Sequence, residues 1–286
     1  MLKKGEGNTA IVMLAWLHGF GLLAQHANGG TPYWGMAWDA GLWESIAMGQ
    51  GHSWTYWLAE IAPAMVSACN AIGVVLIVSW LASFLIPQKH TGIIKLAKLW
   101  ALLLSIWMLV GFMWSWSDRG YAWPYLVENT LRIILPWLLF HWHIAGFKRN
   151  GLSFYIAIAA IALTFLGHGW YAMGLVPVPG SFLHMTHESL GLSEAGSRTF
   201  LIIAGGLDML VVLLVWFQKL RRPMLIYAAA WGIITALARI TGNCYLDFPL
   251  DCLVDWFPEM LVRLCHGLVP LLIISLVEKT HESSKY

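Results

Sequence analysis

Residues 258–274, PEMLVRLCHGLVPLLII, form the stretch that sets the character of this chain. The stretch is apolar enough to lie in a bilayer, yet its first turns carry Glu259, Arg263 and His266. Glu259 precedes Arg263 by four residues, a spacing that puts both side chains on one face of a helix. Charged groups inside a membrane span are costly and usually face a protein interior or a water-filled cavity. We therefore expect a polar site at this point of an apolar helix.

The composition extends this expectation to the whole chain. Of the 286 residues, 59% are hydrophobic and 11% are charged, against about 25% charged residues in soluble domains. The mean hydropathy is +0.66. The apolar runs are continuous rather than alternating and are about twice as long as a membrane β-strand. We predict an all-α, polytopic membrane protein in contact with the lipid bilayer, and the net charge of +2 gives no sign of nucleic-acid binding.

Eight apolar runs of about 20 residues are predicted to span the membrane. Their approximate ranges are 9–27, 58–86, 99–116, 127–144, 152–173, 199–219, 224–241 and 259–277. Lys and Arg gather at the two ends of the chain and in alternate loops, whereas the other loops are acidic and rich in Trp. Basic loops stay on the cytoplasmic side. We expect a multi-pass protein of the cell inner membrane with both termini in the cytoplasm.

Three landmarks recur in the same order and predict an internal duplication. They are a His-Gly pair at His18 and His168, a polar residue before an apolar run at Asn70 and Asp208, and a Glu-x-x-x-Arg start at Glu128–Arg132 and Glu259–Arg263. We predict two four-helix repeats, 1–150 and 151–286. Each repeat contains an even number of spans, so both insert the same way up, related by an axis along the membrane normal.

Four-helix units with polar residues near their outer ends resemble the DoxX-like integral membrane proteins. The local signals are His168-Gly169-Trp170-Tyr171, Arg239 near the end of a span, and Arg263 followed by His266-Gly267. Some DoxX-like proteins are similar to subunits of quinol oxidases or thiosulfate:quinone oxidoreductases, and others look like chaperones. The resemblance implies a quinone-like or lipid ligand and a place in a redox-linked membrane assembly.

Seven polar residues are candidates for ligand binding on the outward-facing side of the membrane. They are Arg132, Arg239, Arg263, His266, Glu128, Glu259 and Asp208. In one interpretation, the two Glu/Arg sets are ion pairs that only hold helices in register. In the other, an arginine binds a carbonyl or an anionic group, because its planar fork donates two parallel hydrogen bonds. Asp208 lies in mid-span and is expected to have a partner, with Arg239 or a histidine the best candidate.

Two further pairs carry separate hypotheses. His18 and His168 could be axial ligands of a haem b or bind a metal, or they could be packing residues beside a close helix approach. No C-x-x-C-H motif for covalent haem is present. Cys244 and Cys252 share one outer loop and are candidates for a disulfide.

The leading functional prediction is an outward-facing polar pocket for a quinone-like or lipid ligand, in a redox-linked assembly with other membrane-protein subunits. The first alternative is a non-catalytic structural subunit or assembly factor of a larger membrane complex. The second alternative is a small-solute transporter. A polar path through both halves of the membrane would favour the transporter, but the ionisable residues gather in the outer half.

Overall fold

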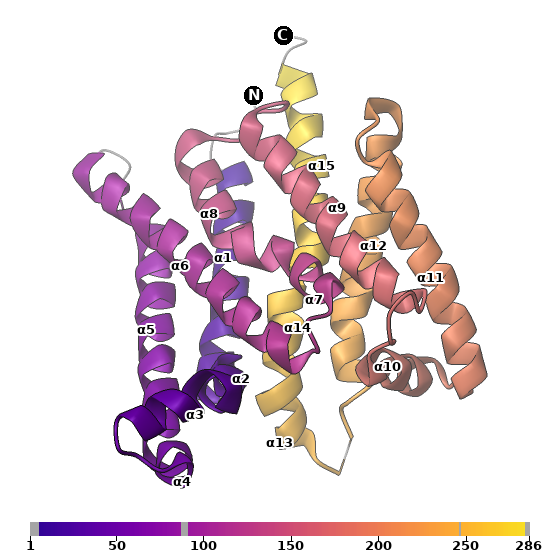
Figure 1. The fold of residues 1–286 in the computed structure, drawn as a ribbon. Helices are drawn as coiled ribbons and strands as arrows, with labels where there is room; N and C mark the ends of the chain where they lie inside the picture. Colours follow the sequence, from indigo (N-terminus) through magenta and orange to yellow (C-terminus); the bar gives the residue numbers. More distant parts are fainter. Residues whose placement is uncertain (1–5, 87–90, 246, 284–286) are drawn as a thin grey trace.

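The computed structural model describes residues 6–86, 91–245 and 247–283, and this part of the chain is 83% helical and has no strands (Figure 1). The prediction of an all-α chain is confirmed for these residues. Long helices run between two ends of the molecule in Figure 1, and short helices gather at the lower end. The continuous apolar runs favour this outcome, because a helix satisfies all of its backbone hydrogen bonds within the segment.

Seven helical segments are long and apolar enough to cross a membrane, which indicates a multi-pass membrane protein. Five of them are single helices: α1 (Glu6–Ala27), α6 (Thr91–Asp118), α9 (Leu152–Ala172), α11 (Glu194–Leu214) and α12 (Gln218–Thr241). The other two are composite. One joins α4 (Trp54–Tyr56), the π-helical turn η1 (Trp57–Ile61) and α5 (Ala62–Ser83), and the other joins α13 (Pro249–Asp251), the π-helical turn η2 (Cys252–Trp256), α14 (Phe257–Arg263) and α15 (Cys265–Ser283).

The predicted fourth span, 127–144, is not one continuous helix. The chain forms α7 (Trp123–Glu128) and α8 (Thr130–Ala145), with a break at Asn129. Asn129 has φ −96° and ψ 1°, and its side-chain amide donates to the Tyr125 carbonyl at 2.8 Å. This local hydrogen bond competes with continuation of the helix. With 16 residues, α8 is shorter than a typical span, so the count of eight spans stays a prediction.

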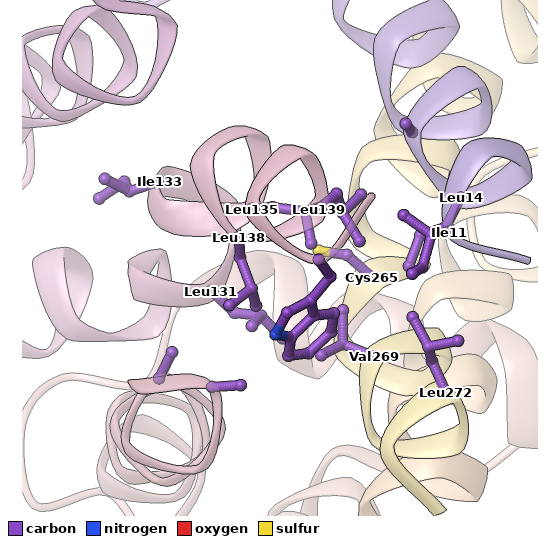
Figure 2. Packing of buried hydrophobic residues seen from close by; sticks show 14 of the residues in the cluster. Ile11, Leu14, Leu131, Ile133, Leu135, Leu138, Leu139, Cys265, Val269 and Leu272 are labelled. Carbon is purple, nitrogen blue, oxygen red and sulfur yellow. The ribbon is translucent and has the colours of Figure 1, made fainter. Parts of the chain in front are cut away.

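The main hydrophobic core surrounds α8. Figure 2 shows Leu139 of α8 on the side of Leu14 of α1, and Leu135, Leu138 and Val269 of α15 belong to the same cluster of buried apolar residues. The helix is buried along most of its length, and Trp80 of α5 donates its indole N–H to the Pro136 carbonyl at 3.0 Å. Burial on several sides explains why the run lacks charged residues after its first turn.

Short helices cover the lower end of the molecule in Figure 1. They are α2 (Tyr33–Ala37), α3 (Ala40–Gly49), α4, α10 (Gly180–Leu190) and α13. Asp39 caps α3 by accepting the Leu42 N–H, and Ser53 caps α4 in the same way from Tyr56. α1 begins and α15 ends at the opposite end of the molecule. The predicted Trp-rich loops therefore lie at the end of the molecule opposite the start of α1 and the end of α15.

Two glycines allow unusually close helix crossings. A Cβ atom at Gly232 of α12 would lie 2.5 Å from the backbone carbon of His266. A Cβ atom at Gly167 of α9 would lie 2.6 Å from the backbone nitrogen of Glu128. Small residues let helix backbones approach in this way. Both crossings bring polar residues of separate helices together.

Candidate functional site

Three of the predicted binding residues meet where α12 crosses α14 and α15. Arg239 lies in the last turn of α12, Arg263 ends α14, and His266 lies in the first turn of α15. The glycine contact at Gly232 sets the spacing of this crossing. Arg239 is 7% exposed and His266 is 3% exposed. The crossing therefore buries cationic and imidazole groups that need partners.

The predicted pairing of Glu259 with Arg263 is present in the structure. Arg263 Nε donates to Glu259 Oε2 at 3.2 Å. The second carboxylate oxygen, Oε1, accepts a hydrogen bond from the side-chain amide of Gln25 on α1. The carboxylate of Glu259 thus links α14 to α1, and both of its oxygens have partners.

The corresponding pairing of Glu128 with Arg132 is wrong. The helix break at Asn129 separates the two residues, so they do not share one continuous helix face. Arg132 Nη1 instead donates to Asn129 Oδ1 at 3.1 Å, and its guanidinium lies 5.0 Å from the centre of the Phe112 ring. This placement satisfies part of the arginine by a cation–π contact.

The side chain of Glu128 contacts α9, which belongs to the second half of the chain. Its Oε2 lies 3.3 Å from His168 Nδ1, although the two atoms are not aligned as a hydrogen bond. The His168 ring lies 5.3 Å from the ring of His266, centre to centre. Arg132, Arg239 and Arg263 all interact electrostatically with Glu128. The structure therefore gathers predicted residues from both halves into one buried polar cluster.

Several buried atoms in this cluster have no hydrogen-bond partner within the described chain. They are Glu128 Oε2, Arg132 Nε, Arg239 Nε and His266 Nε2. Buried polar groups without partners are rare and call for an explanation such as a bound molecule or water. The cluster can therefore form hydrogen bonds with a bound ligand or water through these atoms.

A cavity of about 140 Å³ lies beside the polar cluster. Five predicted residues line it, namely His168, Asp208, Arg239, Arg263 and His266. Most of the remaining wall is apolar and aromatic, with Phe165, Phe182, Phe200 and Trp231 among the lining residues. Mostly apolar walls with a few convergent polar groups are typical of small-molecule sites. Glu128, Glu259 and Arg132 stand behind this wall and do not line the cavity.

The partner of Asp208 differs from the prediction. Asp208 is 2% exposed, and its Oδ1 accepts a hydrogen bond from Tyr227 Oη at 3.2 Å. Neither Arg239 nor a histidine bonds to it in the described chain. Gly169 of α9 lies against Asp208 and lets the two helices approach, so the aspartate is fixed between α9 and α12.

The two histidines of the haem hypothesis occupy different places. His18 is fully buried on α1, has no hydrogen-bond partner among the described residues, and does not line the cavity. His168 contacts His266 and Phe182. The described residues contain no group of three or more His, Cys, Asp or Glu that could hold a metal ion. His18 does not share the cavity with His168.

Cys244 and Cys252 are joined by a disulfide in the structure, with their Cα atoms 4.9 Å apart. The bond closes the loop that leads from α12 to α13. Cys69 and Cys265 are free. The disulfide lies outside the cavity and limits the freedom of the loop that follows Arg239.

Sequence reasoning missed several residues of the site. The α10 helix contributes Phe182, Met185 and Thr186 to the cavity wall, and Gln25 and Tyr227 hold the two carboxylates. The run 180–190 is too short and too polar for a span, and no local pattern indicates that it folds back over α9 and α11. Phe182 and Met185, three residues apart within this run, were the signal that could have pointed to a buried face.

Comparisons with known proteins give no match, whether with family models, curated proteins or solved structures.

Proposed function

We propose that this chain is a multi-pass membrane protein that binds the ring of a quinone-like molecule in the cavity bounded by α9, α10, α11, α12 and α15. One observation carries the proposal. Arg239 Nε and His266 Nε2 are buried, lack partners in the described chain and belong to residues that line an otherwise apolar cavity. A carbonyl oxygen of a bound ring would accept from such donors, while the aromatic side chains cover its faces.

The size of the cavity supports a ligand headed by one ring. Its volume of about 140 Å³ is close to that of an engineered cavity of about 150 Å³ that binds benzene. Ile234 of α12 lines the cavity and is 54% exposed on a helix apolar enough to span a membrane. A ring with a long apolar tail could therefore keep its tail in lipid while its head group lies inside.

We also propose that the chain has eight spans in two four-helix repeats, 1–150 and 151–286. Equivalent helices make equivalent contacts: α1 packs on α14 as α9 packs on α7, and α6 packs on α8 as α12 packs on α15. The glycines after His18 and His168 also match. Gly19 faces Leu81 of α5, and Gly169 faces Asp208 of α11.

The matching contacts support the duplication, and with it we propose a resemblance to DoxX-like proteins and a place in a redox-linked membrane assembly. All residues that line the cavity belong to the second repeat, so we place the ligand site there.

Quinone extraction from gently purified protein tests the proposal. We expect about one quinone per chain, lost when Ala204→Leu fills the cavity and reduced at least tenfold by Arg239→Gln. Ala195→Leu on the exposed face of the same helix is the matched control for added volume. Arg198→Gln is the control for loss of a guanidinium, since Arg198 pairs with Glu194 on the surface at 2.8 Å.

Retention of quinone by both cavity variants would overturn the proposal. If the protein is free of quinone but carries one tightly bound phospholipid, the ligand of the cavity is a lipid head group and not a quinone. A protein free of both that migrates in a large complex would favour the structural-subunit alternative.

A further inference from the structure

A second hollow lies at the lower end of the molecule in Figure 1, away from the polar cluster, where α2 packs on α6. It measures about 400 Å³ and is lined by Trp34, Gly35, Trp38, Asp39, Ser117 and Tyr121. Three of these six residues are aromatic and one is an acid. None of them belongs to the quinone site.

The aromatic rings stand at an angle to one another. Trp34 and Trp38 lie one turn apart on or beside α2, with ring centres 5.2 Å apart and planes at 65°. The two rings therefore meet edge to face, and the ring faces left uncovered carry negative charge density. Trp38 is 56% exposed and Tyr121 is 64% exposed, so the rings are open to a ligand from solution.

Tyr121 adopts an unusual backbone conformation at the rim of the hollow. Its φ is +55°, and the preceding Gly120 also has a positive φ, of +61°. A tyrosine in this region is strained, and such strain is concentrated at binding and catalytic sites. The backbone here directs a large aromatic side chain toward the solvent edge of α6 instead of folding it into the core.

Asp39 supplies the charge. Its Oδ1 accepts the Leu42 N–H at 3.2 Å, which fixes the carboxylate as the N-cap of α3. Within the described chain this is its one side-chain hydrogen bond, so Oδ2 is left for a ligand. The Arg119 guanidinium lies 5.5 Å from the centre of the Tyr125 ring, and the described residues form no ion pair between Arg119 and Asp39.

We propose that this hollow binds a quaternary ammonium group, either as a free solute such as choline or betaine or as the head group of a choline lipid. Aromatic faces around a carboxylate attract a cation that has no N–H groups and therefore needs no hydrogen-bond acceptors. The Ser117 hydroxyl donates to the Trp114 carbonyl at 2.8 Å, so its proton is not directed at a bound cation.

Binding of radiolabelled choline to the full-length protein in phosphatidylglycerol nanodiscs tests the site. We expect Trp38→Leu and Asp39→Asn each to weaken binding about fivefold or more. Asparagine is as good an N-cap as aspartate, so Asp39→Asn removes the charge and keeps α3 capped. Trp216→Leu, which removes an exposed tryptophan elsewhere, should leave binding unchanged.

Two competition experiments complete the test. Tetramethylammonium should displace choline, whereas the uncharged isostere 3,3-dimethylbutan-1-ol should not. Equal competition by the alcohol, or binding unaffected by Trp38→Leu and Asp39→Asn, would overturn the proposal. Suppression of choline binding in phosphatidylcholine nanodiscs would identify the lipid head group as the occupant, and full binding there would identify a free solute.

Discussion

At the scale of single residues, Tyr33 shows how the chain ties a surface helix to its long helices. Trp107 of α6 donates its indole N–H to the Tyr33 hydroxyl oxygen at 2.6 Å. His26 Nδ1 lies 2.7 Å from the Leu22 carbonyl, so this nitrogen carries the proton and Nε2 accepts from Tyr33 Oη at 3.1 Å. Burial raises the pKa of Tyr33 to about 12, and the phenol therefore remains a donor at neutral pH.

We predict that Tyr33→Phe destabilises the protein by about 1–3 kcal/mol, because it leaves the Trp107 N–H and His26 Nε2 without partners. Thermal or denaturant unfolding in nanodiscs measures the change. Tyr56→Phe is the matched control, since Tyr56 is partly exposed and its ring stacks on His52. If Tyr56→Phe destabilises the protein as much as Tyr33→Phe does, the loss of the Tyr33 hydrogen bonds is not the cause.

The buried ionisable residues fall into two groups, those whose side chains are fully hydrogen-bonded within the protein and those that keep an unpartnered atom. Glu259 has both oxygens bonded, to Gln25 and Arg263, and so has a complete structural role. Arg239 and His266 keep unpartnered nitrogens beside the cavity within the described chain. The two interpretations left open by the sequence, register pairs or ligand binding, therefore apply to different residues of one cluster.

At the scale of elements, glycine contacts decide which helices can touch. Gly167 of α9 faces the backbone of α7, and this contact brings Glu128 to His168. Gly232 of α12 faces α15 at His266. Such contacts depend on the absence of a Cβ atom, because backbone atoms of the partner helix cannot move aside as a flexible side chain can.

We predict that Gly167→Ala destabilises the protein by about 1–3 kcal/mol through overpacking and separates Glu128 from His168. A Cβ atom there would meet the Pro124 carbonyl oxygen as well as Glu128, both at 2.6 Å. Unfolding measurements check the first effect. Gly206→Ala on α11 is the control, since a Cβ atom there meets nothing within 4 Å and alanine favours the helix. If Gly167→Ala is as stable as the control, α7 and α9 do not pack as closely at Gly167 as the structure indicates.

The fourth predicted span shows where element-scale prediction fails. Hydropathy placed one helix over 127–144, and Glu128 and Arg132 on one face of it. The Asn129 amide ends α7 instead, and α8 begins at the next residue. The local sequence around Asn129 is compatible with either a continuous helix or a break. The packing of α7 against α9 decides between the two.

At the scale of the whole molecule, the number of membrane crossings depends on whether α7 and α8 together span the membrane. α1 begins and α15 ends at the same end of the molecule in Figure 1. Both ends of the chain would then lie on one side of a membrane, which requires an even number of crossings. Seven segments meet the length and hydropathy of a span, and α7 with α8 would supply the eighth.

We predict that α7 and α8 together cross the membrane. In a bacterial host, alkaline phosphatase fused after residue 121 should be active outside the cytoplasm, and a fusion after residue 148 should be inactive. A fusion after residue 219, in the basic first turn of α12, is the inactive control. Equal phosphatase activity after residues 121 and 148 would show that the pair does not cross, and it would place the two chain ends on opposite sides.

The sequence by itself determined the helical class, the series of apolar spans and the Glu259–Arg263 pair. These features rest on composition and on contacts between residues within one or two turns, which any helix brings together. It also marked Asp208, Arg239, Arg263 and His266, because polar groups in apolar runs need an explanation wherever they lie.

Only the tertiary structure decided which of these groups meet. Gln25 and Glu259 are 234 residues apart, and Glu128 and His168 belong to different halves of the chain. Such contacts depend on how closely whole helices cross, and this depends on glycines whose effect cannot be inferred without knowing the facing helix. The cavity follows from the same crossings, with the addition of α10, whose local sequence does not indicate the face on which it packs.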